Sequence, residues 1–574
     1  MNNAKIAEKF EQLADLMEFQ GANPFRLRAY RNGARVIKDL GEPVQAILND
    51  SNRKLTDIEG VGKGVAEKIE AIVETGNLPQ LDEILEEVPK TVLDILRIPG
   101  LGPKKAAVLF NEMGVTNLEE LKQACEEERV RELDGFGAKT EKVILDGIEI
   151  AAAANQRIYW SEADGIANEL REHFDGCPAI ARLEFAGSYR RGKETVGDLD
   201  ILVDSEDHEA VMNRFGEFAE IASVIGRGET KMSVRLESGF QIDLRVVPAK
   251  SFGAALQYFT GSKDHNVVVR GRAKQMGLKV NEWGVFREKE DEYIAGATEE
   301  DVYGAVDLPW FEPEIRESRK EFDWADQQVL PELISEKDIR SDLHMHTTAT
   351  DGKATLQEMI EAAQTKGHSH IAITDHSKRV TMANGLDEAR LLEQWSEIDE
   401  INESGQFKIV VLKGIECDIL EKGGMDISDE VLAQADWVLG AIHYGQNQPL
   451  RQITDRILEA LENPHVDCIA HPTGRLINKR EAYEVAMDEV LEAAKSQNKI
   501  LELNANPARL DLNDVYCAMA KAKGIPIAIN TDAHSTKGLN VVRFGIKQAR
   551  RAGLTKKDVV NTLTLKQLQK LVGR

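Results

Sequence analysis

Three aspartates in the middle of the chain are spaced so that two β-strands could bring their carboxylates together. Asp198 and Asp200 belong to the run Val196–Val203, where they alternate with apolar residues, and Asp243 sits in the later run Phe240–Val246. Because side chains two residues apart leave the same face of a strand, Asp198 and Asp200 share a face. If the second strand lies beside the first, the three carboxylates converge.

Converging carboxylates repel one another unless cations lie between them, and Mg²⁺ is the natural ion for an all-oxygen site. Two such ions ~3.5–4 Å apart can lower the pKa of a hydroxyl nucleophile and neutralise a phosphoryl group in transfer. In the preceding turn, Gly187 offers a backbone N–H, Ser188 a hydroxyl and Arg191 a forked guanidinium for phosphate oxygens. The spacing predicts a two-metal site for phosphoryl transfer, and its alternative is three solvated aspartates at strand edges.

A second set of chemical groups lies nearer the C-terminus. Six of the twelve histidines and three carboxylates stand at or just beyond the ends of β-rich runs. They are His344, His346, Asp351, His376, Glu416, His443, His471, Asp532 and His534. One buried histidine is more often a core residue than a ligand, but nine such groups at consecutive strand ends predict a metal centre. The mixed nitrogen and oxygen ligands suit manganese or zinc, and the choice between these two stays open.

Seven β-rich runs, separated in several places by helical stretches, must position these nine groups. The runs are Ile339–His346, His370–His376, Ile409–Glu416, Trp437–His443, Cys468–His471, Ile500–Asn504 and Ile525–Asp532. Strand–helix alternation at this spacing predicts a parallel sheet, and seven strands suggest closure into a barrel. Barrels place their active sites at the carboxyl ends of the strands, where six of the seven runs end on a histidine or a carboxylate.

The first 150 residues instead repeat a short signal, in which apolar residues and glycines alternate before a basic helix start. The signal occurs at Ile58–Lys63, at Ile98–Lys105 and, in weaker form, at Leu133–Lys139. The glycines let backbone N–H groups at a helix N-terminus approach a phosphate, and the neighbouring lysine adds a positive charge. A single copy would usually be a helical turn without a ligand, but three copies predict helix–hairpin–helix motifs.

The central motifs, taken in order, closely resemble the family X DNA polymerases, the polymerase beta type. The resemblance rests on Gly187–Arg191, Gly197–Asp200, Asp243 and Tyr258–Ser262. It implies a palm domain in which the three aspartates bind two Mg²⁺ or Mn²⁺ ions and Asp243 activates the primer 3′ hydroxyl. DNA and deoxynucleoside triphosphates would be the substrates.

The same resemblance implies a nucleotide site. The residues expected in or around it are Gly187, Ser188, Arg191, Gly197, Arg245, Tyr258, Phe259, Gly261, Asn266 and Arg270. Ser188 and Arg191 would bind the triphosphate, and Arg245 would couple to the metal carboxylates. The Tyr258–Phe259 turn would close on the sugar and disfavour a 2′ hydroxyl, with Asn266 and Arg270 facing the incoming nucleotide and the template. The segment Lys263–His265 departs from the polymerase beta form.

The segment Phe25–Arg31 and the first hairpin resemble the N-terminal domain of the same polymerases, which grips the 5′ phosphate of a DNA gap. The resemblance implies that the second hairpin holds the primer strand. The residues expected to contact DNA are Arg26, Tyr30, Gly60, Gly62, Lys63, Gly100, Gly102 and Lys104. Lys68 matches the position of the lyase lysine, which attacks a deoxyribose-phosphate aldehyde as a neutral amine. Its alternative role is contact with the 5′ phosphate alone.

The C-terminal pattern resembles the polymerase and histidinol phosphatase (PHP) superfamily, and all nine expected ligand positions are present. This resemblance implies a distorted seven-stranded barrel with up to three Mn²⁺ or Zn²⁺ ions that cleaves phosphoesters. A family X polymerase followed by a PHP domain is the arrangement of the bacterial family X polymerases, so the resemblance covers nearly the whole chain.

We therefore expect a multidomain α+β and α/β protein: helical helix–hairpin–helix domains, a nucleotidyltransferase palm and thumb, and a C-terminal (β/α) barrel. The expected boundaries are 1–85 for the 5′-phosphate-binding domain, 86–155 for the fingers-type subdomain, 156–255 for the palm, 256–316 for the thumb, 317–336 for a linker and 337–574 for the PHP domain.

Composition agrees with a cytoplasmic multidomain enzyme. The 574 residues include 42% apolar side chains, and the net charge of −26 argues against a protein that coats nucleic acid with its whole surface. The N-terminus lacks the pattern of a signal peptide, and no apolar run is long enough to span a membrane. The five cysteines form no CxxC pair. We expect a monomer that binds gapped or nicked DNA with a 5′ phosphate.

Three functional hypotheses remain at this point. The first is a gap-filling repair polymerase with a metal-dependent 3′–5′ exonuclease, to which cleavage at abasic sites is a further candidate activity. The second keeps the polymerase but makes the barrel a phosphatase or pyrophosphatase for small molecules. The third is a non-catalytic clamp on DNA ends, which is disfavoured because such a clamp has no use for two complete sets of converging polar groups.

Overall fold

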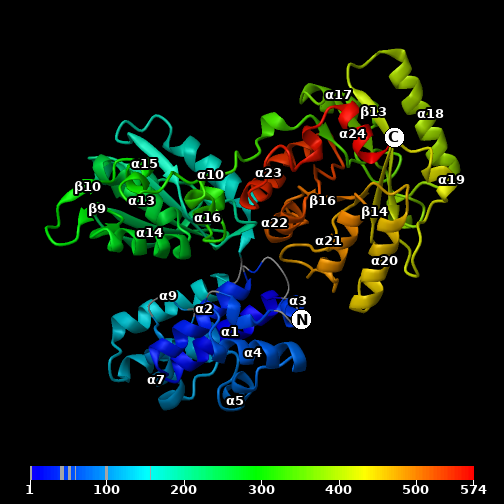
Figure 1. Ribbon diagram of the computed structural model, residues 1–574. Coiled ribbons are helices and arrows are strands. Elements are labelled where there is room, and N and C mark those ends of the chain that lie inside the picture. Colours follow the sequence, from blue (N-terminus) through cyan, green and yellow to red (C-terminus); the bar gives the residue numbers. More distant parts are fainter. Residues whose placement is uncertain are drawn as a thin grey trace. The chain divides into compact units, whose positions relative to one another are not determined.

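The structure, a computed structural model, describes residues 3–573 apart from 39, 41–43, 50–52, 59, 97, 99–100 and 155–156. The chain divides into two compact units, the first made of Met1–Arg157 and Arg235–Phe240, and the second of Ile158–Val234 and Gln241–Arg574 (Figure 1). Among the described residues, no helix is both long and apolar enough to cross a membrane.

The described part of residues 1–157 is helical. Its α-helices are α1 (Asn3–Phe19), α2 (Pro24–Lys38), α3 (Val44–Asn49), α4 (Lys63–Thr75), α5 (Pro79–Glu87), α6 (Val92–Ile95), α7 (Pro103–Met113), α8 (Leu118–Glu126) and α9 (Ala138–Ala154). Each of the three predicted hairpin signals ends where a helix begins, at α4, α7 and α9. Gly62 and Gly102 are the residues that precede α4 and α7, so the glycines stand at helix N-termini as the repeat predicts.

The second unit begins with a five-stranded sheet in the order β2-β4-β7-β6-β5. These strands are β2 (Arg182–Phe185), β4 (Asp198–Asp204), β5 (Ile221–Arg227), β6 (Lys231–Leu236) and β7 (Gln241–Val247). The short strands β1 (Ile158–Tyr159) and β3 (Thr195–Val196) form a separate pair, and the helices are α10 (Trp160–Phe174), α11 (Gly187–Arg190) and α12 (His208–Gly216). Strands β4 and β7 are parallel neighbours, which is the relationship that the three aspartates require.

A helical segment and a small antiparallel sheet follow. The elements are α13 (Phe252–Thr260), α14 (Lys263–Gln275), β8 (Leu278–Asn281), β9 (Gly284–Arg287), β10 (Tyr293–Ala295) and α15 (Glu299–Gly304). Residues 317–336, expected as a linker, carry α16 (Glu321–Asp326), and Glu317 and Glu321 are buried. This segment is therefore packed against its surroundings rather than extended.

The C-terminal region is a seven-stranded sheet whose strand order follows the sequence, and every neighbouring pair is parallel. The strands are β11 (Ser341–Asp342), β12 (His370–Ile373), β13 (Val410–Asp418), β14 (Trp437–Ala441), β15 (Cys468–Ile469), β16 (Ile500–Asn504) and β17 (Ile527–Asn530). A parallel bridge between Met345 and Ala533 links the segments that follow the first and last strands, so the barrel is nearly closed. The predicted seven-stranded barrel is confirmed, although several strands are shorter than their apolar runs.

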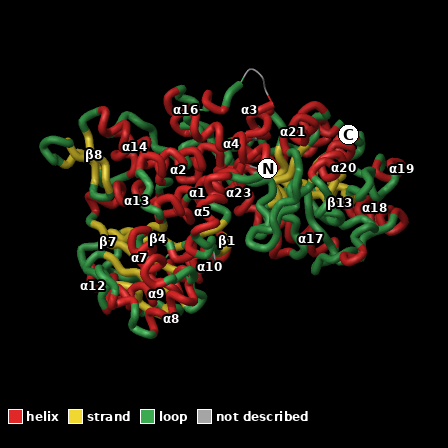
Figure 2. Tube along the Cα trace, turned by 90° about the horizontal axis from the view of Figure 1, so that it is seen from below, coloured by secondary structure: helices red, strands yellow, loops and turns green. Residues whose placement is uncertain are grey.

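Helices follow most of the barrel strands. They are α17 (Leu356–Thr365), α18 (Glu388–Ser404), α19 (Asp429–Leu432), α20 (Leu450–Glu462), α21 (Met487–Ser496), α22 (Asp514–Lys523), α23 (Val542–Arg551) and α24 (Leu565–Val572). Figure 2 shows strand β13 in yellow with the red helix α18, which packs against it. Buried apolar residues of strands and helices form a large cluster and a second, smaller one around Trp437, and together these fix the strand ends on which the predicted ligands stand.

Candidate active sites

The carboxylates of the central sheet lie close together, as the alternation of side chains along the two strands predicts. In the register of β4 and β7, Asp200 lies opposite Asp243 and Asp198 lies opposite Gln241. Burial, together with the charges of Asp198 and Asp243, raises the pKa of Asp200 to about 7. The three groups therefore share one negative field, which is the environment that attracts divalent cations.

Asp243 has a basic partner that sequence reasoning missed. Lys231 on β6 places its Nζ 2.9 Å from Asp243 Oδ2, and Gln241 Nε2 donates to Asp243 Oδ1 at 2.9 Å. Burial opposes ionisation of Asp243, but the hydrogen bonds from Lys231 and Gln241 outweigh it and lower its pKa. No local pattern marks Lys231, because it reaches the site from a different strand.

The turn at α11 brings the predicted phosphate ligands against the same carboxylates. Gly187 has a φ of +62°, and a Cβ at this position would lie 2.6 Å from Asp200 Oδ2. Only glycine fits this conformation and this approach. Ser188 is the second residue of α11, and Arg191 follows the helix directly. Arg191 donates from Nη1 to the Thr260 carbonyl at 2.5 Å and from Nε to Glu317 Oε1 at 3.0 Å.

The predicted sugar and base contacts lie at the end of α13 and on α14. Asn266 Nδ2 donates to the Tyr258 carbonyl at 2.8 Å, while its Oδ1 accepts from Gln257 at 2.7 Å. Arg270 Nε donates to the Asn266 carbonyl at 3.2 Å. These bonds join the Tyr258 turn to the helix that carries Asn266 and Arg270.

Two further predicted residues flank this turn. The Arg245 guanidinium lies 4.4 Å from the centre of the Phe259 ring, and its charge acts to lower the pKa of Asp200 against the stronger effect of burial. At Gly261, where φ is +69°, a Cβ would lie 3.2 Å from Arg191 Nη1. The predicted nucleotide residues therefore approach one another from the sheet, α11 and α13.

The segment Lys263–His265, which departs from the polymerase beta form, has a structural role here. His265 is fully buried, with Nδ1 2.9 Å from Glu321 Oε1 and Nε2 2.8 Å from the Tyr303 hydroxyl. Its ring also stacks on Phe322 at 4.9 Å. The departure thus accompanies the packing of α16 against α14.

All nine predicted barrel ligands gather in one place, and Glu416 on β13 is at its centre. The Glu416 carboxylate is fully buried and lies 2.8 Å from His376 Nδ1 and 2.8 Å from His471 Nε2. The Nε2 atoms of His443, His344 and His346 lie 3.4, 3.5 and 3.7 Å from it. One carboxylate therefore lies close to five histidines from four different segments of the chain.

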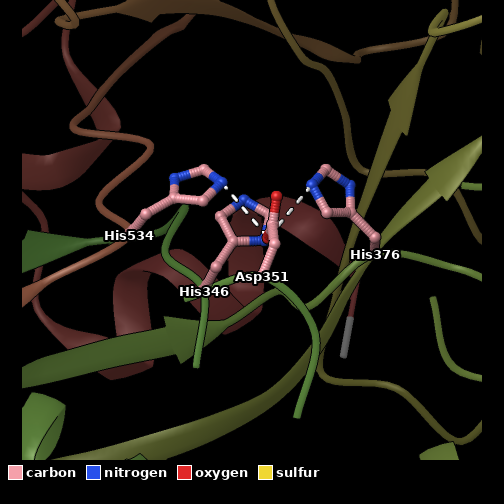
Figure 3. A group of neighbouring side chains, drawn as sticks. All are labelled: His346, Asp351, His376 and His534. Carbon is pink, nitrogen blue, oxygen red and sulfur yellow. Dashed lines mark ion pairs between the residues drawn. The ribbon is translucent and has the colours of Figure 1, made fainter. Parts of the chain in front are cut away.

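The remaining ligands stand on either side of His346. Asp351 lies 3.6 Å from His376 Nε2 and 3.3 Å from His534 Nε2, and Figure 3 shows its carboxylate pointing between these two rings. Asp532 Oδ1 lies 3.1 Å from His346 Nε2. Three overlapping groups have ligand atoms close enough to share an ion: His346, Asp351, His376 and His534; His344, His346 and Glu416; His376, Glu416 and His443.

The electrostatics of the cluster suit cations. Burial works against charge on Glu416, yet His443, His376 and His344 lower its pKa well below its ordinary value. Burial likewise opposes protonation of His376, but Glu416 and Asp351 raise its pKa to about 10. His344 Nε2 is buried without a hydrogen-bond partner, while Glu416 and Asp532 lie beside it. Such a nitrogen could coordinate a divalent cation, which would replace the protons that the cluster otherwise holds. The donor set therefore fits a metal centre.

Two carboxylates that sequence reasoning missed orient these ligands. Glu502 on β16 accepts from His344 Nδ1 at 2.7 Å and, through Oε2, from the His471 backbone N–H at 2.8 Å. Asp418 lies 3.0 Å from His443 Nδ1. A carboxylate on the second nitrogen of a metal-binding histidine fixes its ring and its tautomer. The signal for Glu502 was available: it interrupts the apolar run Ile500–Asn504, the one run without a predicted ligand.

The hairpins of the first unit leave their backbone accessible. A Cβ added at Gly62 or Gly102 would meet nothing within 4 Å, so a phosphate has room at both helix N-termini. At Gly60 φ is +91°, which favours glycine. Lys63 and Lys104 are exposed, and Gly100 lies outside the described residues.

Lys68 and Tyr30 lie together, with the Lys68 Nζ 5.8 Å from the centre of the Tyr30 ring. The Tyr30 hydroxyl donates to Gln80 at 3.2 Å. Arg26 is exposed one turn before Tyr30 on α2. Lys68 is partly buried.

Comparison with protein families accounts for most of the chain. Helix–hairpin–helix descriptions match residues 1–78, 52–107 and 92–149, the DNA polymerase beta palm matches 157–230, the DNA polymerase beta thumb matches 255–317, and the PHP domain matches 342–506. The predicted order of helix–hairpin–helix, palm, thumb and PHP regions is confirmed.

Curated proteins match the same regions. The DNA polymerase/3′-5′ exonuclease PolX of Bacillus subtilis is 40% identical to this chain, and the match covers the full length of both proteins. DNA polymerase lambda of Rattus norvegicus is 28% identical over 55% of this chain and 56% of its own length. A probable phosphatase of Thermoanaerobacter sp. is 28% identical over 38% of this chain and 89% of its own length.

Proposed function

Because this chain belongs to the bacterial family X DNA polymerases that carry a PHP domain, we propose that it fills short gaps in DNA and degrades DNA from the 3′ end. The proposal combines two chemistries in one chain. The gap-filling activity is supported by the alignment of Asp200 with Asp243 on neighbouring parallel strands. The degradation of DNA ends is supported by the convergence of five histidines, from four segments of the chain, on Glu416.

In the polymerase, Asp198, Asp200 and Asp243 would hold two divalent cations, which we assign as Mg²⁺ or Mn²⁺. These ions would neutralise the triphosphate and favour the ionised primer hydroxyl. The chain itself positions the substrates: the Gly187 turn and Ser188 bind phosphate oxygens, and the Arg191 guanidinium places its positive charge beside the triphosphate. Asp243 accepts the proton of the primer 3′ hydroxyl. Tyr258 and Phe259 contact the sugar.

In the barrel, the nine ligands would hold up to three Mn²⁺ or Zn²⁺ ions, which would activate water and polarise a phosphodiester. The chain keeps the histidine rings in place through Glu502 and Asp418 and shields most of the site from solvent. His534 and Asp351 are its more exposed members, so we place the approach of the DNA end on their side.

The helix–hairpin–helix motifs would hold the DNA, with the Gly62 hairpin on the 5′ phosphate and the Gly102 hairpin on the primer strand. Base excision repair in the bacterial cytoplasm, on the DNA of the nucleoid, is the setting that such a substrate indicates. We propose a monomer, in which one chain supplies both sites. The boundaries 1–85, 86–155, 156–255, 256–316, 317–336 and 337–574 remain our proposed division of the chain.

Lys68 is the proposed nucleophile of a deoxyribose-phosphate lyase step, and contact with the 5′ phosphate alone is the alternative. Borohydride treatment of the full chain on a DNA substrate with a 5′-deoxyribose phosphate separates the two. A covalent adduct that disappears in Lys68→Ala but persists in Lys63→Ala supports the lyase. Without an adduct, this region acts as a phosphate clamp.

A second function for the barrel has its own support, since relatives of the barrel region carry the name probable phosphatase. The full chain should therefore be given three substrates with Mn²⁺: a 3′-recessed DNA duplex, a duplex with an abasic site, and the small phosphomonoester p-nitrophenyl phosphate. Shortening of the 3′ end is the result that the proposal expects, and cutting at the abasic site would add the endonuclease activity. Hydrolysis of the small ester without any DNA cleavage would favour the phosphatase.

A further inference from the structure

An arginine of the PHP region contacts the nucleotide-binding arginine of the polymerase through a shared carboxylate. Arg551, the last residue of α23, donates from Nη1 to Glu317 Oε1 at 2.9 Å. Arg191 Nε donates to the same oxygen at 3.0 Å. The Arg551 and Glu317 side chains are only 3% and 9% exposed, so water does not screen this contact.

Arg551 is itself held in place. Its Nη2 lies 2.8 Å from Asp514 Oδ2 on α22, and its Nη1 also donates to the Arg191 backbone carbonyl at 2.8 Å. The guanidinium therefore touches both the backbone of Arg191 and the carboxylate that orients the Arg191 side chain. A planar, forked cation can make these contacts together, whereas a lysine offers a single point charge.

The same helix supports the next residue of the turn. Gln548, three residues before Arg551 on α23, donates to the Gly192 carbonyl at 2.8 Å. At Gly192 φ is +66°, and a Cβ there would lie 2.9 Å from Lys547 Cδ. Glycine at this position therefore permits α23 to approach the turn closely.

Both regions contribute charged side chains to this cluster. Burial opposes the ionised form of Glu317, but Arg551 and then Arg191 and Lys193 lower its pKa below its ordinary value. Removal of Arg551 leaves two buried carboxylates, Glu317 and Asp514, with one cation fewer. Glu317 then keeps Arg191 Nε at 3.0 Å and Lys193 Nζ at 3.7 Å as its ion-pair partners, so the Arg191 guanidinium is held more strongly toward Glu317 and away from a triphosphate.

We propose that Arg551 is a positioning residue for nucleotide addition, by which the PHP region sets the orientation of Arg191 toward the incoming deoxynucleoside triphosphate. Arg551 acts through Glu317 and through the Arg191 carbonyl. The inference rests on the proposed role of Arg191 at the triphosphate, and it assigns to the PHP region a part in polymerisation that is separate from its own metal site.

The test is steady-state extension of a one-nucleotide gap by the full chain with varied nucleotide concentration. In Arg551→Met, the KM for the nucleotide should rise about tenfold while kcat stays within about twofold. The nucleotide KM of Arg551→Lys should lie between those of Arg551→Met and the wild type. Gln548→Leu, which removes only the Gly192 contact, should raise KM less.

Arg543→Met is the matched control. Arg543 lies on the same helix and bridges to Asp164 in α10 at 2.7 Å, so it joins the same two regions at a carboxylate bound by Tyr189 rather than at Glu317 or the Arg191 backbone. Thermal melting identifies a variant that fails to fold, in which case Gln548→Leu carries the test. Equal KM values in Arg551→Met and Arg543→Met would overturn the proposal.

The same series separates this inference from the function on which it rests. If Arg191→Ala raises the nucleotide KM and neither Arg551→Met nor Gln548→Leu does, only the positioning role fails. If Arg191→Ala itself leaves the nucleotide KM unchanged, the assignment of Arg191 to the triphosphate is wrong. A loss of 3′-end degradation in Arg551→Met at unchanged nucleotide KM would place Arg551 with the barrel and would likewise overturn the proposal.

Discussion

Asp200 on β4 lies directly opposite Asp243 on the parallel strand β7. The backbone thus sets two carboxylates side by side, with Asp198 two residues away on the same face. Lys231 compensates the charge of Asp243, while burial and the neighbouring aspartates raise the pKa of Asp200 to about 7. Without a cation, the negative charge of this pair is only partly compensated, and this excess of negative charge is the physical basis of the proposed metal site.

Gly187→Ala should strongly reduce nucleotide addition. The added Cβ would lie 2.6 Å from Asp200 Oδ2 on a backbone with positive φ, so either the turn or the carboxylate must move. We expect a loss of about 10²-fold or more in gap filling, with 3′-end degradation retained. Gly165→Ala is the control, since a Cβ on that residue of α10 meets nothing within 4 Å. Normal extension by Gly187→Ala would contradict the assignment of this turn.

The barrel ligands should show the reverse behaviour. His344→Ala, Glu416→Ala and Asp532→Ala each remove a buried ligand, and we expect them to stop Mn²⁺-dependent shortening of 3′ ends while gap filling continues. Metal analysis of the purified protein should find fewer bound manganese or zinc ions, and the melting temperature should fall because metal binding stabilises the folded barrel. Unchanged metal content with unchanged degradation would refute the site.

Glu502→Gln should weaken metal binding without removing a ligand. The amide keeps the shape of the side chain but loses the charge that faces His344 Nδ1 at 2.7 Å. Loss of such a partner typically costs about 10–100-fold in metal affinity. Isothermal titration calorimetry with Mn²⁺ measures this loss of affinity. Restoration of degradation at high Mn²⁺ concentration is the expected signature, and wild-type affinity would show that Glu502 has no orienting role.

Glu299→Gln should destabilise the polymerase region in a pH-dependent way. Glu299 is buried, but Arg316 and Arg190, each within 3.1 Å of its carboxylate, lower its pKa below the ordinary value. A lowered pKa in the folded state gives stabilisation that is fully present above the unfolded pKa of ~4.3 and is lost as the pH falls through the lower folded pKa.

The loss in Glu299→Gln should be about 3–5 kcal/mol at pH 7, as expected when one partner of a buried ion pair is removed. The gap in melting temperature from the wild type should narrow as the pH falls below about 4. Glu288→Gln, an exposed position, serves as the control. A gap that stays constant from pH 7 to pH 3 would show that the charge of Glu299 contributes nothing.

The sequence predicted the parts of the fold that repeat a local rule. Alternation placed Asp198 and Asp200 on one face, and polar residues at consecutive strand ends identified the barrel ligands. Strand lengths were predicted less well: β11 is only Ser341–Asp342, because the chain bearing His344 and His346 continues past the ladder toward Ala533.

Residues that act across long sequence distances could not be predicted. Lys231 meets Asp243 only because β6 and β7 are neighbours, and Arg551 meets Glu317 across more than 200 residues. The segment 317–336 reads as a polar linker, yet Glu317 is buried because Arg551 and Arg191 pair with it, and Glu321 is buried because it accepts hydrogen bonds from the backbone N–H groups of Ser318 and Arg319 and contacts His265. Charge pairing of this kind leaves no periodic signal in the sequence.

The most direct test of the account is a gapped duplex with a labelled primer, incubated with nucleotides and either Mg²⁺ or Mn²⁺. The enzymes compared are the wild type, Asp198→Ala/Asp200→Ala and His344→Ala/Glu416→Ala. We expect the first double variant to shorten the primer without extending it, and the second to extend the primer without shortening it. Extension by Asp198→Ala/Asp200→Ala at near the wild-type rate would contradict the assignment of the central carboxylates as the site of polymerisation.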